Sequence, residues 1–211
     1  MTDRLLVISF LALILLSLAP QAALCEENAV GLEEQLKEVE RKLVNKPNDL
    51  ELGFDRAWLL RRLNRESEAL SELSKLERRF PKESKLYVLM AESLAGLKRY
   101  DEAIRTANRA IELSSSKTRA YFTRGGIYFR SRQFESCISD LTSALKDTTN
   151  NDLSDSEVAL ALYSRALAQY KLNGPSEMVV KDLTQSLRFH SNPDADKFRL
   201  RVMAELNGKS K

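Results

Sequence analysis

The sequence predicts an all-α protein, an α-solenoid of antiparallel helix pairs with a capping helix at each end. Helix-favouring residues dominate it, since 43% of the 211 residues are apolar and 30% are charged, against only 7 glycines and 5 prolines. Apolar side chains recur at helical spacing along most of the chain. Several columns of residues also repeat after 34 positions, as expected for stacked units of two helices.

The 34-residue period is clearest in columns of small residues. In the stretch Tyr100–Leu113, Ala103, Ala107 and Ala110 share one side of a helix and bury little apolar area. Small residues at a crossing let two helix backbones approach closely, while bulky neighbours fill the flanks. The columns are Ala57, Ala91 and Gly125; Ala69, Ala103 and Cys137; and Leu76, Ala110 and Ala144.

Residues 1–25 are predicted to be an export signal. Arg4 lies in a short polar start, an apolar run covers residues 5–19, and Pro20 and small residues follow it. The run is shorter than the ~20 residues that a membrane-spanning helix needs. We therefore expect an exported protein, periplasmic or secreted, with an uncleaved membrane anchor as the alternative.

Cys25 leaves a second cleavage scheme open. Cutting after Cys25 follows the small-x-small pattern, whereas a bacterial lipoprotein is cut before the cysteine and carries lipid on its sulfur. Leu24 differs from the Gly, Ala or Ser that usually precedes a lipidated cysteine, which favours the soluble exported form. Because Cys137 is the only other cysteine, the sequence excludes a disulfide scaffold.

The predicted units follow the signal in order. Pro47 closes an N-terminal helix, and Asn192 with Pro193 provides the N-cap and first turn of the last helix. The segment 138–145 is echoed by 180–187 at an offset of 42, because a polar linker adds residues before the last unit. The parts are an N-terminal helix at 26–48, repeats at 50–83, 84–117 and 118–147, a linker at 148–156, a divergent repeat at 157–191 and a C-terminal capping helix at 192–208.

The middle unit carries a recognisable motif. Its first helix is expected at 84–97 and its second at 101–113, with Tyr87, Met90, Ala91, Leu94, Tyr100, Ala103, Ala107 and Ala110 at the repeated positions. This pattern resembles the tetratricopeptide repeat. The resemblance extends over about Leu50 to Leu187, although Gly53 and Leu76 depart from it in the first unit. It implies a curved superhelix whose inner surface is lined by the first helix of each pair and binds other proteins.

The residues expected on that inner surface are mostly aromatic or cationic. Aromatic side chains supply contact area at low entropic cost, and arginines pair with carboxylates, so we expect a partner segment with acidic and apolar residues. The predicted groove residues are Phe54, Trp58, Arg61, Arg62, Lys85, Arg119, Phe122, Phe129, Arg130, Tyr163, Tyr170 and Lys171.

Two alternatives stay open for this surface. The aromatic residues could complete the packing of neighbouring helices, and the arginines could form a solvated face. The repeats could also self-associate in a structural protein of the cell envelope. Some members of the family grip a terminal carboxylate with Lys and Asn, but Phe54 and Trp58 occupy two of those places, so that mode is not expected.

No residue pattern points to catalysis, a cofactor or a metal. His190 is the only histidine and has no cysteine or carboxylate at ligand spacing. Gly125 and Gly126 fall inside a helix and form no phosphate-binding loop, and Cys137 is expected to be a buried core residue. A net charge of +3 with interspersed signs argues against nucleic acid. The membrane is expected to be a partner only through a retained N-terminal segment.

Overall fold

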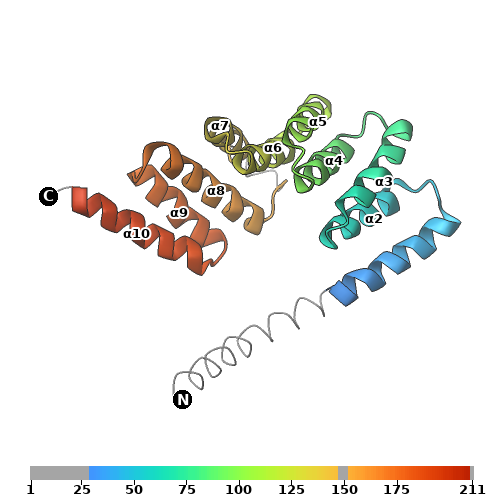
Figure 1. Cartoon of the computed structure of the whole chain (residues 1–211), viewed down its shortest axis with the longest axis horizontal. Coiled ribbons are helices and arrows are strands. Elements are labelled where there is room, and N and C mark those ends of the chain that lie inside the picture. The colour runs from blue at the N-terminus through green and yellow to red at the C-terminus, as the bar shows by residue number, and fades with distance from the viewer. Residues whose placement is uncertain (1–28, 147–151, 210–211) are drawn as a thin grey trace, which may run out of the picture. The chain divides into compact units, whose positions relative to one another are not determined.

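The computed structural model of the chain describes residues 29–146 and 152–209, and every regular element in these residues is a helix (Figure 1). This confirms the all-α fold class. A helix at residues 29–45 comes first. It is followed by α2 (Leu50–Arg62), α3 (Glu66–Arg79), α4 (Ser84–Gly96), α5 (Tyr100–Leu113), α6 (Thr118–Arg130), α7 (Phe134–Ala144), α8 (Asp155–Asn173), α9 (Glu177–Phe189) and α10 (Pro193–Lys209).

The chain divides into two compact units within α3. Unit 1 extends to Glu72 and unit 2 begins at Leu73. The predicted signal at 1–25, including Cys25, lies outside the described residues, as does much of the predicted linker at 148–156. In the middle repeat, the observed helices begin and end within one residue of the predicted bounds.

In unit 1, helix 29–45 packs on the pair α2 and α3. The buried core consists of Leu36, Leu59, Leu60 and Ala69, with Leu32, Val39 and Leu63 partly buried around it. The side chain of Asp49 accepts a hydrogen bond from the Leu52 amide at 3.1 Å and so caps the start of α2.

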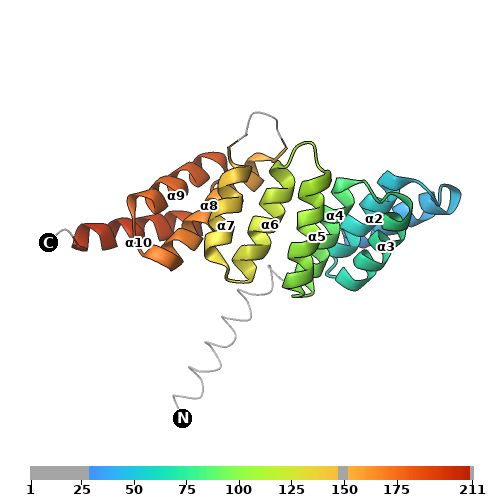
Figure 2. The same ribbon diagram turned by 90° about the horizontal axis from the view of Figure 1, so that it is seen from above.

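In unit 2, antiparallel neighbours lie side by side from α4 to α7 (Figure 2). The small residues of the predicted columns lie at the crossings, since Ala91, Ala103, Ala107, Ala110, Cys137 and Ala144 are all 0% exposed. Gly125 shows how close the approach is: a Cβ there would lie 2.7 Å from Leu141 Cδ2. The small columns therefore set the spacing of the paired helices.

The turns inside the helix pairs repeat with the same period. Asn64, Lys98 and Arg132 each follow the first helix of a pair by two residues and adopt a left-handed backbone, with φ of 58°, 61° and 62°. The turn of the last pair differs: Gly174 follows α8 directly and combines a φ of 75° with a ψ of −161°. Asparagine and glycine enter this region at little cost, whereas lysine and arginine do so only when the packed helices on both sides hold the turn.

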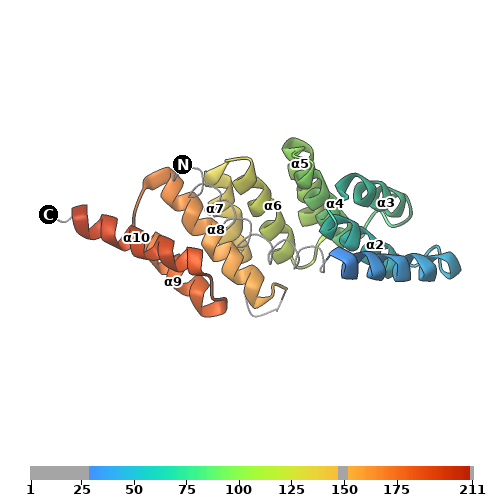
Figure 3. The ribbon, with the colours of Figure 1, turned by 60° about the horizontal axis from the view of Figure 1, so that its bottom comes forward.

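The C-terminal end of unit 2 consists of α8, α9 and α10, with α10 packed on α9 (Figure 3). Its core contains Ala166, Val179, Leu183, Ala195, Phe198 and Val202. Ser154 and Glu157 form a capping box at the start of α8. Asn192 Oδ1 accepts from the amides of Asp194 at 3.0 Å and Ala195 at 3.2 Å, which confirms the predicted N-cap of α10.

A feature that the sequence analysis missed is an arginine of the first helix that binds a carboxylate of the second. Arg124 donates from Nε and Nη2 to the two oxygens of Asp140 at 2.6 and 2.7 Å. Its Nη1 donates to Asn108 of the preceding helix at 2.6 Å, so one side chain joins three helices. The carboxylate side chain is only 6% exposed, which makes this pair part of the packing between helices.

The same arrangement occurs in two other pairs. Arg165 binds Asp182 at 2.8 and 2.7 Å and Thr142 at 3.2 Å. In unit 1, Arg56 binds Glu72 at 2.6 Å and Glu40 at 3.1 Å. The pair α4 and α5 differs, because Met90 and Thr106 occupy the arginine and carboxylate positions.

Candidate protein-interaction surface

The first helices of the pairs in unit 2 contact each other in series. α4 contacts α6, and α6 contacts α8. Thr123 of α6 donates a hydrogen bond to Glu92 Oε1 of α4 at 3.3 Å. Their outward side chains therefore form one surface, which we call the inner-helix surface. The predicted groove residues on these helices are Lys85, Arg119, Phe122, Phe129, Arg130, Tyr163, Tyr170 and Lys171.

Along α4 and α6 this surface is partly used for packing. Phe122 and Phe129 are half-buried against the core cluster that contains Cys137 and Leu141. The ring of Phe129 also meets Phe134 edge-on at 6.0 Å between centroids. Lys85 and Arg130 are exposed, and Arg130 lies 6.0 Å from the ring centre of Tyr100. Phe122 and Phe129 therefore contribute to the packing of neighbouring helices and also keep part of their surface exposed. They fit both the groove prediction and the packing alternative.

Arg119 binds a carboxylate of its own chain. Its guanidinium donates to Glu157 at 2.6 and 3.0 Å and to the carbonyl oxygen of Asp152 at 2.6 Å. The hydrogen bond from Arg119 is the main cause that lowers the pKa of Glu157 to about 2, helped by bonds from Ser154. In return the carboxylate raises the pKa of Arg119. The inner-helix surface therefore already contains one arginine–carboxylate contact.

A hollow of about 500 Å³ opens between α8 and α10. We call it the α8–α10 hollow. It is lined by Tyr163, Leu167, Asp194, Lys197, Phe198 and Arg201. Three of these side chains are apolar or aromatic, two are cationic and one is acidic, so the lining combines apolar area with a small net positive charge. Arg201 Nε also lies 3.7 Å from Glu205 Oε1 on its own helix.

The aromatic wall of this hollow is fixed from both helices. The Tyr170 ring meets Phe198 edge-on at 5.1 Å, and the Tyr170 hydroxyl donates to Glu205 at 3.0 Å. The guanidinium of Arg201 lies 4.9 Å from the Phe198 ring centre and 5.5 Å from that of Tyr170. Stacking of this kind holds the cation at the mouth of the hollow.

The structure brings Tyr163 to the α8–α10 hollow, packs Tyr170 against Phe198, which lines it, and leaves Lys171 exposed on α8. The sequence analysis treated α10 only as a cap and so missed Lys197, Phe198 and Arg201. A signal existed, because Lys197 and Arg201 are four residues apart and therefore share a face of the helix.

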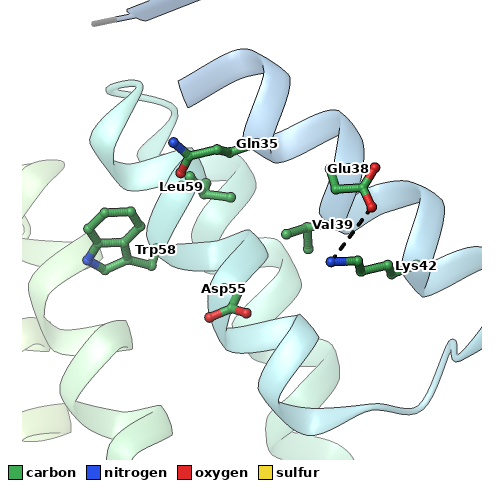
Figure 4. Close-up of a pocket in the computed structure, with 7 residues that line it drawn as sticks. All are labelled: Gln35, Glu38, Val39, Lys42, Asp55, Trp58 and Leu59. Carbon is green, nitrogen blue, oxygen red and sulfur yellow. Dashed lines mark ion pairs between the residues drawn. The ribbon is translucent and has the colours of Figure 1, made fainter. Parts of the chain in front are cut away.

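In unit 1 the predicted groove residues differ in exposure. Phe54 is 2% exposed, so its assignment to a groove surface is wrong: the same repeat position in α4, Val88, is also buried, because it faces a neighbouring helix. Arg61 approaches Glu66 at 3.6 Å. Trp58 is 44% exposed, and the Arg62 guanidinium lies 5.3 Å from its ring centre. A hollow of about 280 Å³ opens beside Trp58, between α2 and helix 29–45 (Figure 4).

The described residues, 29–146 and 152–209, also bear on two other kinds of site. Within these residues no group of histidine, cysteine and carboxylate side chains could hold a metal ion. None of the helices there is both long and apolar enough to cross a membrane. Cys137 is buried as predicted, and burial raises the pKa of its thiol to about 12.

These features define the class of the protein as an all-α helical-repeat fold of paired helices. Residues 84–117 match a family model described as a tetratricopeptide repeat. No curated protein sequence matches the chain significantly.

Solved structures show the same fold at low sequence identity. TTC0263, a thermophilic TPR protein of Thermus thermophilus, is 16% identical over 85% of this chain and 94% of that one, with a TM-score of 0.67. MamA is 17% identical over 78% and 91% of the two chains, with a TM-score of 0.59. YrrB, described as a TPR protein with an unusual peptide-binding site, is 15% identical over 84% and 86%, with a TM-score of 0.57.

Proposed function

We propose that this protein is a non-catalytic interaction module that binds a segment of a partner protein on the inner-helix surface of unit 2. The α8–α10 hollow is the observation that carries the proposal. A fold of stacked helix pairs does not identify a function by itself, whereas the side chains of that hollow indicate which chemistry it can bind.

The chemistry of the hollow selects the partner segment. Tyr163 and Leu167 are half-buried and offer apolar area beside the buried Phe198, which favours an apolar or aromatic side chain. Lys197 and Arg201 at its rim favour a carboxylate next to that side chain. The occupant is therefore a segment in which acidic and apolar residues alternate or adjoin.

The contact of Arg119 with Glu157 supports the same chemistry further along the surface. It shows a carboxylate held by two hydrogen bonds at the level of α6 and α8. The similarity of the fold to YrrB adds that a TPR protein with a peptide-binding site can have this architecture. A partner segment that runs from the hollow towards α6 would find exposed cationic residues, Lys171 and Arg130, beside half-buried aromatic ones.

The test uses two labelled peptides of equal length, one of alternating Glu and Leu and one of alternating Lys and Leu, titrated with the protein by fluorescence anisotropy. We expect the acidic peptide to bind and the basic one not to bind. Lys197→Glu with Arg201→Glu should weaken binding by roughly tenfold or more, because two attractive charges become repulsive. A matched control, Lys181→Glu with Arg188→Glu on α9, makes the same change of net charge away from the hollow.

The outcomes separate specific binding from general attraction. Equal weakening by the control would mean that only the net charge of the protein matters, and unchanged binding by the hollow variant would place the site elsewhere. Either result would reject the hollow as the site of recognition.

We also propose that the protein acts in the cell envelope, delivered by the export signal predicted at residues 1–25. Fractionation of cells would locate the chain, and lipid labelling of the parent and of Cys25→Ala would decide between lipid attachment and release. A parent chain found only with cytoplasmic markers would reject the export proposal.

A further inference from the structure

α10 has the register of a first helix, although no second helix pairs with it in the described residues. Its buried residues match those by which α6 packs on the preceding helix. Aligning the starts of the two helices places Ala195, Phe198 and Val202 at the positions of Ala120, Thr123 and Ile127, and all six are buried. α10 therefore packs on α9 as α6 packs on α5.

In the same alignment, α10 presents the pairing positions of a first helix with one departure. Arg199, Leu200 and Met203 fall at the positions of Arg124, Gly125 and Tyr128, the face by which α6 meets α7. Leu200 replaces the small residue of this column, so a helix that packs here crosses α10 at a larger distance than α7 crosses α6. In α10 this face is open, since Leu200 is 54% and Met203 is 38% exposed. A hollow of about 350 Å³ lies next to Met203. The cap of a solenoid normally has a polar outer side, so these apolar side chains need an explanation.

Arg199 shows what this face lacks. Arg124 and Arg165 each bind a carboxylate on the second helix of their pair. Arg199 instead binds Asp196, one turn away on its own helix, at 2.7 Å. The arginine position is thus preserved, while the carboxylate that it binds in the complete pairs comes from another helix.

Helix 29–45 has the register of a second helix, and within the described residues, 29–146 and 152–209, no first helix precedes it. Glu40 binds Arg56 from the preceding helix, as Asn108 binds Arg124, which fixes the register of helix 29–45 as a second helix. In this register Glu38 takes the carboxylate position of Glu72.

The pairing face of helix 29–45 consists of Gln35, Glu38, Val39 and Lys42. Together with Asp55, Trp58 and Leu59 of α2 these residues line the hollow of about 280 Å³ in unit 1 (Figure 4). Glu38 is half-exposed, and its recorded ion pairs are with Arg41 and Lys42 of its own helix.

We propose that α10 of one copy pairs with helix 29–45 of a second copy and so completes a helix pair between molecules. Arg199 binds Glu38 across this contact, and Leu200 and Met203 cover Val39. The two faces are complementary in charge. The larger side chains Gln35, Lys42 and Leu200 stand at the positions of the small columns, so this contact has a wider crossing than the pairs within the chain. Because the contact joins different surfaces of identical chains, it repeats and forms open, head-to-tail assemblies.

The test is sedimentation velocity of the purified full chain over a wide dilution series. We expect the average mass to rise with concentration above the 24.0 kDa of one chain, without a plateau at a dimer. Arg199→Glu and Glu38→Arg should each weaken association roughly tenfold or more, because like charges then face each other. Arg188→Glu, the same charge reversal on α9, should leave association unchanged, and circular dichroism checks the helical content of each variant.

Mixing the two variants gives the decisive result. Each variant alone repels itself, but an equimolar mixture of Arg199→Glu and Glu38→Arg chains offers matched charges at every contact. We expect the mixture to associate as the parent does. A parent that stays monomeric, association that resists both reversals, or a mixture that stays dissociated would each overturn the proposal, as would a different protein seated on the α10 face of a monomeric chain.

Discussion

The pair of Arg124 and Asp140 gives the sharpest prediction for stability. Arg124→Met removes the guanidinium and leaves a carboxylate that is only 6% exposed without its two hydrogen bonds. Loss of one member of a buried ion pair costs about 3 kcal/mol or more, because the remaining charge stays desolvated. For a chain of this size that corresponds to a fall in Tm of about 6 to 12 °C.

The chain itself supplies the matched control. The pair α4 and α5 folds with Met90 and Thr106 at the positions of Arg124 and Asp140. The double variant Arg124→Met with Asp140→Thr copies this natural solution, so no buried charge is left alone. We expect it to recover most of the loss and to remain within about 1 kcal/mol of the parent.

The assay is thermal and urea unfolding followed by circular dichroism, with a double-mutant cycle over the parent, the two single variants and the double variant. The reasoning requires that the single variant Arg124→Met be clearly less stable than the double variant. If the two unfold together, the carboxylate is well solvated in solution and the pair contributes no more than a surface salt bridge.

Three other predictions concern local features. Gly125→Ala should lower the free energy of unfolding by about 1 kcal/mol or more, because its methyl group would meet the buried Leu141. The control Gly126→Ala has nothing within 4 Å and should raise the free energy of unfolding by about 0.5–1 kcal/mol. Equal effects of the two variants in urea unfolding would refute the close crossing. In a Cys25→Ala background Cys137, with a pKa raised to about 12 and 0% exposure, should react with a thiol reagent only on unfolding. Rapid labelling of that folded variant would contradict the burial of Cys137. The pKa of Glu157 is lowered to about 2, so its contribution to folding stability is present above its ordinary pKa of 4.5 and is lost as the pH falls towards 2. Glu157→Gln should lack this part of the pH dependence of Tm. Identical Tm profiles for the parent and the variant would contradict the prediction.

The repeat architecture can be predicted from the sequence because it depends on local sequence patterns. The 34-residue step, the small columns and the N-cap of α10 depend on residues within one or two helices, where periodicity and capping act directly. Burial of Ala103, Ala107, Ala110 and Cys137 follows from the same pattern and is confirmed.

The candidate site was only partly readable. Tyr163 and Tyr170 were expected on the surface, but their neighbours Lys197, Phe198 and Arg201 lie on a helix taken only as a cap. Phe54 was assigned to the groove from its place in the repeat, which gives the direction of a side chain and not which neighbouring helix covers it.

The sequence alone therefore determined the fold class, the bounds of the two helices of the middle repeat and the residues at the crossings, since these follow from chemistry along the chain. Only the tertiary structure decided which charges meet, because Arg124 and Asp140 are 16 residues apart and pair through the packing of two helices. It also decided which faces stay open. The exposed Leu200 and the intrahelical pair of Arg199 depend on what packs against α10, and a residue's place in a repeat cannot supply that neighbour.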